Sequence, residues 1–312
     1  VLQDFFIDND IPNPGQIYRA TVDRPIKGQG GCFLKTPDGS AFLRQGKGLS
    51  QGSRLLVQVS GFAETGKAIP VSRKILLKSR YVIITPENPG LNISRQIKNE
   101  ERREELIALI RLNFKDFKEG MILRSSCKNA LDKDILDDAE EMLNLAGKIF
   151  SDESNEEQLI LESDKPHALA WREWSQDALV FSEIGSFEIH GVLDLLEELK
   201  SERVETSDGH FFIETTRACT TVDINTGSDT SPAAALKANL ATARDLPRQL
   251  RLRGIGGQII LDPAPISKKD RKIFDTSLRA AFRKDSVETN IVGWTPMGLI
   301  EIQRARVRSS WK

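Results

Sequence analysis

The chain carries a run of short apolar segments in QIYRATVDRPIKGQGGCFLKTPDGSAFLRQG, residues 16–46. Two segments of the same kind follow, SRLLVQVSGF (53–62) and KAIPVSRKI (67–75), and Gly, Pro and Asp-Gly turns separate them all. Short strands at roughly ten-residue spacing are typical of small all-β domains. We therefore predict a small barrel or sandwich between about residues 17 and 73.

Aromatic residues mark one side of this predicted β domain. Phe33 and Phe42 fall on neighbouring strands, with Arg44, Lys47 and Lys67 near them in the sequence. An OB-type barrel uses such rings to stack nucleic-acid bases while cations follow the backbone. The alternative is that both rings fill the barrel core, and the pattern alone favours neither.

Outside this region the apolar spacing predicts further helices and strands. Pro247 interrupts one long cationic helix and implies a kink or an end near Leu246. The predicted helices are 102–112, 135–150, 187–199, 232–253 and 269–285, and the predicted strands are 80–88, 120–126, 210–217, 219–225, 258–262 and a strand-like segment over 291–306.

Composition restricts the class of protein. With 312 residues the chain is long enough for about two domains, and 39% hydrophobic residues exclude a disordered chain. No apolar stretch reaches the roughly 20 residues of a membrane-spanning helix. Cys32, Cys127 and Cys219 form no CxxC pair, which speaks against a disulfide framework and a Cys-based zinc site. We expect a soluble protein of the cytoplasm without a membrane span.

The net charge of −1 averages over two unlike regions. Between Asp132 and Asp164 there are 12 acidic residues against two lysines, whereas residues 236–312 contain 16 Lys and Arg against 7 Asp and Glu. A basic face attracts phosphate backbones. The alternative reading of either stretch is ordinary solvated helix surface.

Carboxylates occur where two predicted strands end. Asp223 and Asn225 are two residues apart and share one face of an extended chain, and Asp262 ends a second apolar strand. Such carboxylates suit a hard divalent cation, Mg²⁺ above all, which activates water and stabilises charge on a phosphate. Aspartates at strand ends also serve as helix caps and turn formers. The chain has no GxSxG elbow and no Walker loop.

Three stretches resemble the bacterial ribonuclease E/G family in order and spacing. They are IETTRACTTVDINTGS (213–228), NLATARDLPRQLRLRGIGGQIILD (239–262) and MGLIEIQRAR (297–306). Weaker likeness runs through TGKAIP (65–70) and EGMILRSS (119–126), so that nearly the whole chain is covered.

The resemblance implies a multidomain α+β fold. An OB-fold barrel (15–74) and a 5′-sensor-like region (75–150) would be inserted in an RNase H-like domain. That domain would be formed by residues 1–14 and 151–202. A DNase I-like α/β catalytic domain would follow at 203–312.

The resemblance also implies roles for individual residues. Asp223 and Asp262 would be the Mg²⁺ ligands, with Mn²⁺ as a substitute, and Asn225 would orient within that catalytic site. The RNA-binding residues would be Phe33, Phe42 and Lys67. Arg124 and Ser125 match the Arg-Thr pair with which the family grips a 5′-monophosphate, and Arg suits that role because its planar fork donates two hydrogen bonds.

The chain departs from the family in two places, one that bears on the expected partners and one in the sensor. Family members continue into a CPxCxGxG zinc-link that joins protomers, and this chain ends at Lys312 without it. We therefore expect no zinc site in this chain and no zinc-linked dimer, while another kind of homodimer stays open. Ser79 stands where the family often has Gly in the sensor.

The resulting hypothesis is a Mg²⁺-dependent endoribonuclease acting on single-stranded RNA, such as an mRNA or an rRNA precursor. It would leave a 5′-phosphate and a 3′-hydroxyl. One alternative is a non-catalytic RNA-binding adaptor that keeps the fold. A weaker one is a DNA nuclease or phosphodiesterase on the same scaffold.

Overall fold

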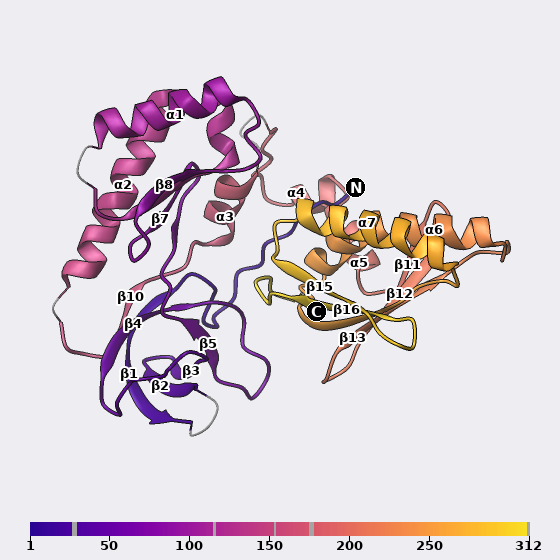
Figure 1. Ribbon diagram of the computed structural model, residues 1–312, viewed down its shortest axis with the longest axis horizontal. Coiled ribbons are helices and arrows are strands. Elements are labelled where there is room, and N and C mark those ends of the chain that lie inside the picture. The colour runs from indigo at the N-terminus through magenta and orange to yellow at the C-terminus, as the bar shows by residue number, and fades with distance from the viewer. Residues whose placement is uncertain (27–29, 115–116, 153, 175–177, 311–312) are drawn as a thin grey trace. The chain divides into compact units, whose positions relative to one another are not determined.

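The computed structural model describes residues 1–26, 30–114, 117–152, 154–174 and 178–310 (Figure 1). The chain divides into two compact units. Unit 1 consists of Val1–Ile7 and Ala178–Lys312, and unit 2 is the continuous segment Asp8–Asp177. Unit 1 has one hydrophobic core and unit 2 has two.

Unit 2 begins with a closed β-barrel, which confirms the small β domain predicted for this region. The strand order is β1-β2-β3-β5-β4, and pairing of β4 with β1 closes it. A sixth strand, β10 (Gln158–Leu161), pairs with β1. Tyr18, Leu34 and Val57 are fully buried inside the barrel. The five barrel strands are β1 (Ile17–Pro25), β2 (Cys32–Thr36), β3 (Gly39–Leu43), β4 (Arg54–Val59) and β5 (Ile69–Ser72).

The second half of unit 2 is a four-stranded sheet with two helices. Its strand order is β6-β7-β9-β8. Helix α2 packs on β7 through Ile135, Ala139 and Met142, whose spacing places them on one side of the helix. The elements are β6 (Leu77–Lys78), β7 (Val82–Thr85), β8 (Gly90–Ile93), α1 (Glu100–Asn113), β9 (Gly120–Leu123), a short 3₁₀ helix (Ser125–Lys128) and α2 (Asp132–Ser151). After β10 comes α3 (Pro166–Glu173).

Unit 1 is built on one six-stranded sheet in the order β11-β12-β13-β14-β16-β15. Only the β13–β14 pair is parallel, and the other pairings are antiparallel. The strands are β11 (Arg203–Thr206), β12 (Gly209–Thr215), β13 (Thr220–Asn225), β14 (Gly257–Asp262), β15 (Thr289–Trp294) and β16 (Ile300–Arg304).

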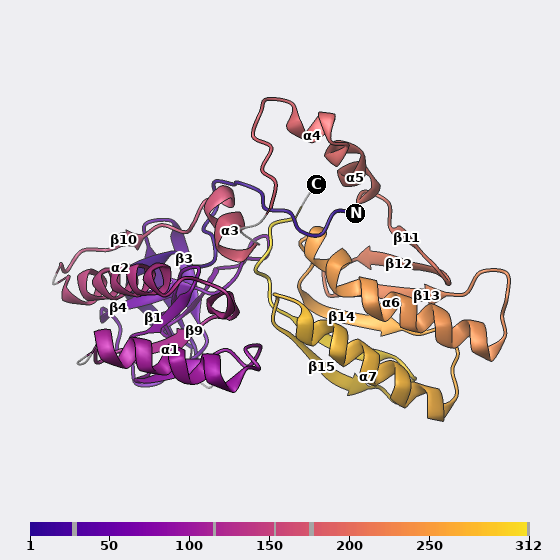
Figure 2. The ribbon, with the colours of Figure 1, turned by 90° about the horizontal axis from the view of Figure 1, so that it is seen from above.

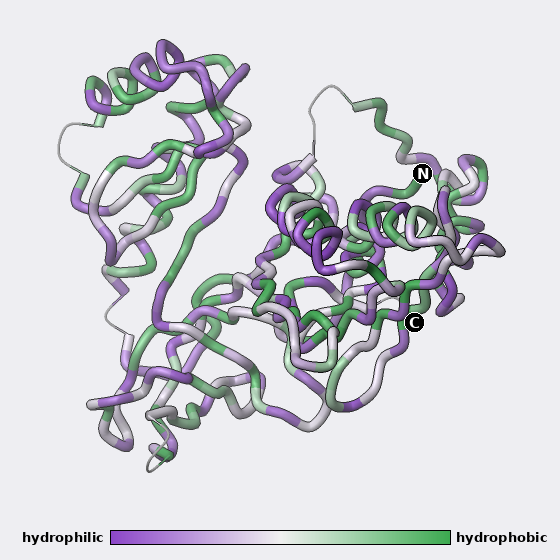
Figure 3. Tube along the Cα trace, turned by 45° about the vertical axis from the view of Figure 1, so that its right-hand side comes forward, coloured by the Kyte–Doolittle hydropathy of each residue, from purple (hydrophilic) through white to green (hydrophobic). Residues whose placement is uncertain are grey.

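Two long helices, α6 (Pro232–Leu252) and α7 (Lys268–Lys284), cover the same face of the unit 1 sheet (Figure 2). The core between sheet and helices contains Phe211, Val222, Leu246 and Phe274. Hydrophilic and hydrophobic residues alternate along the helices, as half-buried helices require (Figure 3). No helix among the described residues is long and apolar enough to cross a membrane.

Arginines hold the N-terminal segment of the chain in unit 1. Arg248 Nη1 donates to the carbonyl of Leu2 at 3.0 Å, and Arg251 Nη2 donates to that of Gln3 at 2.7 Å. Asp4 forms an ion pair with Arg308 at 3.0 Å. Residues from both ends of the sequence therefore build one unit.

Two predicted elements differ in the structure. The single helix expected over residues 187–199 is two short helices, α4 (Ser186–Ile189) and α5 (Val192–Glu198), because Gly191 between them has a φ of 65°. The segment over 291–306 is not one strand but parts of the hairpin β15–β16.

The helix predicted over 232–253 is confirmed as Pro232–Leu252, and of the two outcomes considered at Pro247, an end near Leu246 does not occur, while a kink stays a prediction. Pro247 lies within the helix and is buried. A proline there removes one backbone hydrogen bond, at a cost of about 3 kcal/mol. Burial of Leu246 and Leu250 on either side contributes roughly 1.5–3 kcal/mol each and outweighs this cost. The helix ends instead at Leu252, before Gly254, where φ is 64°.

Candidate active site

Asp223 and Asp262 lie side by side on the sheet face opposite α6 and α7. In β13, Val222 and Ile224 point into the core, so Asp223 points the other way. In β14, Leu261 is buried and Asp262 is exposed. The parallel register pairs Asp223 directly with Asp262. Because neighbouring strands lie about 4.8 Å apart, the two carboxyl groups are adjacent.

Asn225 shares this face and is bonded to the first carboxylate. Its Nδ2 donates a hydrogen bond to Oδ2 of Asp223 at 2.7 Å, which orients both side chains. The backbone of Gly209 lies close to that of Asn225. A Cβ on Gly209 would lie 2.4 Å from the Asn225 carbonyl oxygen, so only glycine fits at position 209. The structure thus brings together all three residues that the sequence proposes for one site.

The environment of Asp262 disfavours its ionisation. Burial raises the pKa of Asp262, and the charge of Asp223 raises it further. Asp223 and Asp262 would supply carboxylate ligands to a divalent cation, whose positive charge would offset the second effect, and Asn225 would orient Asp223. Among the described residues no three His, Cys, Asp or Glu side chains cluster as a metal site. Two adjacent carboxylates match the ligands that Mg²⁺ commonly takes in proteins, one or two carboxylates with several waters.

Asn239 fixes the loop that follows Asp262. Its side chain is fully buried in α6. The amide Nδ2 donates to the carbonyl of Ala264 at 2.9 Å, and the Ala264 N–H donates to Oδ1 at 3.0 Å. This pair of hydrogen bonds holds the chain two residues beyond the candidate ligand.

Phe33 and Phe42 lie outside the barrel core. They are directly opposite each other on β2 and β3, with ring centroids 5.4 Å apart. Their strand neighbours Leu34 and Leu43 fill the core instead, so the alternative that both rings are core residues is wrong. The Arg24 guanidinium lies 4.9 Å from the centre of the Phe33 ring.

Lys67 lies in the loop before β5, the strand that pairs with β3 and places Pro70 opposite Phe42. Its Nζ forms an ion pair with Glu64 at 2.6 Å. The lysine side chain is largely exposed. An exposed ion pair contributes little free energy, so Lys67 can exchange Glu64 for another anion at small cost.

Arg124 follows β9 and is held by two acceptors. One guanidinium nitrogen donates to the carbonyl of Ser79, and Nη2 donates to Oε2 of Glu173 at 2.6 Å. Ser125 is exposed at the start of the 3₁₀ helix. The Ser79 hydroxyl donates to Asp138 at 2.6 Å.

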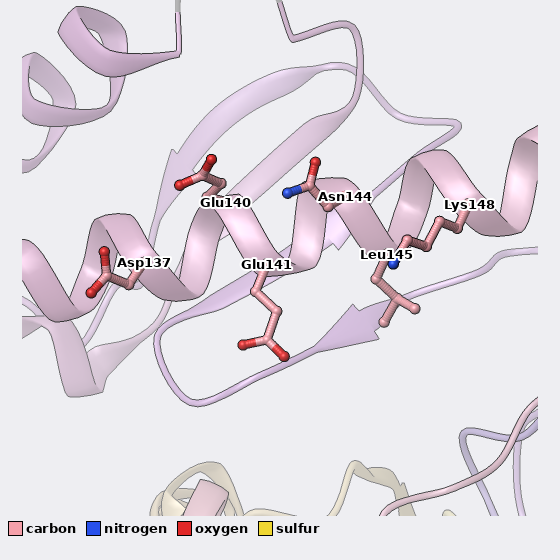
Figure 4. Close-up of a pocket in the computed structure, with 6 residues that line it drawn as sticks. All are labelled: Asp137, Glu140, Glu141, Asn144, Leu145 and Lys148. Atoms are coloured by element: carbon pink, nitrogen blue, oxygen red, sulfur yellow. The ribbon is translucent and has the colours of Figure 1, made fainter.

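Exposed charge of opposite sign gathers on helix α2 of unit 2 and on helix α7 of unit 1. In unit 2, α2 exposes a pocket lined by acidic groups, whose side chains project from the helix in Figure 4. In unit 1, α7 exposes Lys268, Lys269 and Lys272 in its first turns, shortly after Asp262. A polyanion is attracted to the second surface and repelled by the first. The α2 pocket is lined by Asp137, Glu140, Glu141, Asn144, Leu145 and Lys148.

The sequence analysis did not identify Asn239 and Glu173, although both make hydrogen bonds at these sites. Asn239 opens the NLATARDLPRQLRLR motif, which is the signal that could have drawn attention to it. Glu173 carries no comparable signal, because its partner Arg124 is 49 residues away in the chain.

Comparisons with a family model and with curated relatives lead to the same family. The model described as "Ribonuclease E/G family" matches residues 76–180 and 178–307. Ribonuclease G of Haemophilus influenzae is 28% identical over 299 residues, which cover 83% of this chain and 61% of that protein.

Further relatives match over almost the whole chain. Ribonuclease G of Salmonella typhimurium is 26% identical, and the match covers 99% of this chain and 76% of the relative. Ribonuclease E of Synechocystis is 25% identical, with 98% of this chain and 54% of the relative covered. This chain therefore spans between about half and three quarters of the length of these relatives.

Proposed function

The chain belongs to the ribonuclease E/G family, and from this we propose that it is a divalent-metal-dependent endoribonuclease that cleaves single-stranded RNA during RNA processing or decay. The products would be a 5′-phosphate and a 3′-hydroxyl. The observation that carries the proposal is the direct pairing of Asp223 with Asp262, together with the hydrogen bond from Asn225. The names of the relatives support the substrate class.

We propose that the functional regions are arranged as in that family. The closed barrel supports an OB-type RNA-binding domain over 15–74, and the sheet of β6–β9 with α1 and α2 would be the sensor region over 75–150. The α/β sheet of unit 1 would form the DNase I-like catalytic domain over 203–312. Residues 1–14 and 151–202 would supply the RNase H-like part.

Each residue of the proposed site has a distinct task. Asp223 and Asp262 would hold Mg²⁺ or Mn²⁺, and Asn225 would keep the Asp223 carboxylate turned toward it. When bound, the cation supplies an activated water and a positive charge to offset the charge that develops on the phosphate. Asn239 maintains the loop after Asp262, so the second ligand keeps its position.

The RNA would be held away from the reacting bond by the barrel. Phe33 and Phe42 present ring faces on which bases stack, and Arg24 and Lys67 supply cations for the backbone. The lysines of α7 would attract the strand toward the two carboxylates. Arg124 would bind the 5′-phosphate.

Substitution of the carboxylates tests the proposal. We expect Asp223→Asn and Asp262→Asn to reduce Mg²⁺-dependent cleavage of an A/U-rich single strand by at least about 100-fold, because each removes one negative ligand. Glu301→Gln is the matched control, since Glu301 is exposed on the same face of the sheet. If the two Asn variants cleave as fast as the wild-type protein, the assignment is wrong.

The same assay separates the alternatives. Tight RNA binding without Mg²⁺-dependent cleavage would show a binding adaptor that keeps the fold. Equal cleavage of ribo- and deoxyribo-oligomers of one sequence would show a nuclease that does not select RNA.

A further inference from the structure

Helix α3 and Trp174, the residue that follows it, contact Arg80 and Arg124 within unit 2. Arg124 is the residue proposed to bind the 5′-phosphate. Arg80 donates to the backbone carbonyl of Trp174 at 3.0 Å and also to that of Trp171. Arg124 donates to the carboxylate of Glu173 at 2.6 Å. The two arginines thus bind the end of α3 from the side of the sensor sheet.

The contact between Arg124 and Glu173 is largely shielded from water. The side chains are 21% and 24% exposed. Burial opposes ionisation of Glu173, but Arg124 and Arg172 outweigh it and lower the pKa of the carboxyl. The carboxylate is therefore charged at neutral pH, and it occupies the guanidinium of the residue proposed to bind phosphate.

Glu173 has a second cationic partner. Arg172 Nε donates to Oε1 of Glu173 at 2.7 Å, and Arg172 also pairs with Asp164. If Arg124 turns to another anion, Glu173 still has the charge of Arg172 beside it. When Arg124 exchanges Glu173 for another anion, the Glu173 carboxylate therefore keeps Arg172 as an ion-pair partner.

A carboxylate and a phosphate monoester present the same kind of acceptor to a guanidinium. We propose that Glu173 limits how strongly a phosphorylated 5′ end is preferred: its carboxylate stands in for the terminal phosphate on Arg124, and a phosphorylated 5′ end must displace it to bind. This inference rests on the proposed function, and specifically on Arg124 as the sensor residue.

The physical basis is competition between charges. A terminal phosphate carries between one and two negative charges near neutral pH and three acceptor oxygens, whereas Glu173 carries one charge and two oxygens. A 5′-hydroxyl has no charge with which to compete. Glu173 would thus lower the affinity for a phosphorylated 5′ end, which must displace it from Arg124, and leave the affinity for a 5′-hydroxyl end unchanged.

Binding measured without divalent metal tests this, because no cleavage then occurs. The probes are one short single-stranded RNA with a 5′-monophosphate and the same RNA with a 5′-hydroxyl, each labelled at the 3′ end for fluorescence anisotropy. Glu173→Gln keeps the size of the side chain and removes its charge. We expect the ratio of affinities, phosphate over hydroxyl, to rise about tenfold, which corresponds to one charge-assisted hydrogen bond.

Controls separate this effect from general changes. Glu105→Gln removes a carboxylate from another arginine pair, that of Arg102 in α1, and should leave the ratio unchanged. Glu173→Asp keeps the charge but shortens the side chain, and should give a smaller rise than Glu173→Gln. A ratio that stays constant or falls in both Glu173 variants overturns the proposal.

A circular RNA distinguishes this proposal from the proposed nuclease activity. A circle has no 5′ end, so Glu173→Gln should cleave it with Mg²⁺ as fast as the wild-type protein does. If neither protein cleaves circular or linear RNA, the nuclease activity is refuted, while the affinity ratio still decides the role of Glu173.

Discussion

At the scale of single residues, the pairing of Asp223 with Asp262 has an electrostatic consequence. Both groups are exposed on the same face, and the charge of Asp223 raises the pKa of Asp262. Burial contributes more to this shift than Asp223 does. The site is therefore at its most unfavourable when both groups are ionised and no cation is bound.

We expect Asp223→Asn to lower the pKa of Asp262 toward the ordinary carboxyl range without reaching it, because burial persists. Carboxyl ¹³C NMR titration of metal-free protein measures this directly. Glu301→Gln removes a charge elsewhere on the same face and should move the pKa of Asp262 less. An unchanged pKa in Asp223→Asn would contradict the electrostatic coupling of the pair.

The raised pKa of Asp262 also predicts a pH dependence of stability. An acid whose pKa is higher in the folded state stabilises that state below its unfolded pKa, and this contribution is lost as the pH rises through the folded pKa. In that window metal-free wild-type protein should lose stability relative to Asp262→Asn. Thermal unfolding at a series of pH values measures the difference, and saturating Mg²⁺ should reverse it.

Residue roles differ in how far the sequence predicts them. Asp223, Asn225 and Asp262 were accessible because strand alternation and strand ends are local properties. Asn239 and Glu173 were not, because their partners Ala264 and Arg124 are 25 and 49 residues away. Only the folded chain brings those pairs together.

At the scale of elements, α6 and the loop after β14 are joined through one side chain. Asn239→Ala would leave the N–H and C=O of Ala264 buried without their partners, and we expect a loss of about 2–4 kcal/mol in the free energy of unfolding. Chemical denaturation measures it. Asn290→Ala, an exposed asparagine on β15, is the control and should change stability by less than about 0.5 kcal/mol.

The rings of Phe33 on β2 and Phe42 on β3 lie outside the barrel core, so replacing them should not disrupt the barrel. We expect Phe33→Ala or Phe42→Ala to weaken binding of a single-stranded RNA by roughly 5- to 100-fold, the range for loss of one stacked base. Anisotropy measures the affinity, and thermal unfolding checks that the barrel persists. Phe150→Ala, which removes an exposed ring from α2, should leave the affinity unchanged.

Element boundaries show where periodicity is informative. The helices over 102–112 and 135–150 were predicted because their apolar residues recur at helical spacing, and the structure has them as α1 and α2. Pro247 left open whether α6 continues past Leu246, because the packing of Leu246 and Leu250 cannot be predicted from a single proline. Strand β11 was missed, since four residues with one buried side chain carry little pattern.

At the scale of the whole molecule, the assignment of residues 151–202 to an RNase H-like domain stays a prediction. The described residues of this stretch form β10, α3, α4 and α5. β10 pairs with β1 of the barrel, and residues from 178 onward belong to unit 1. Local spacing does not reveal such pairings, because short elements take their place from partners that are distant in the sequence.

The composition of unit 1 leads to a prediction for fragments. A fragment of residues 8–177 should fold alone, because unit 2 has its own cores. A fragment of residues 178–312 should be less stable than unit 1 by on the order of 3 kcal/mol, since Arg248, Arg251 and Arg308 lose the hydrogen bonds and the ion pair that they form with residues 2–4. Denaturant unfolding measures this loss.

A peptide of residues 1–7 provides the control for the second fragment. Added in excess, it should restore stability to the 178–312 fragment, whereas a peptide of the same composition in scrambled order should not. Equal stability of that fragment with and without the peptide would show that the N-terminal segment contributes nothing.

The joining of both chain ends in unit 1 also affects how the protein is made. The ribosome produces Val1–Ile7 before unit 2, and only after all of unit 2 the arginines of α6 that bind residues 2 and 3. At about 5–20 residues per second, this delay is on the order of tens of seconds. A nascent chain halted before residue 232 would therefore carry a folded unit 2 behind an N-terminal segment that still awaits its partners.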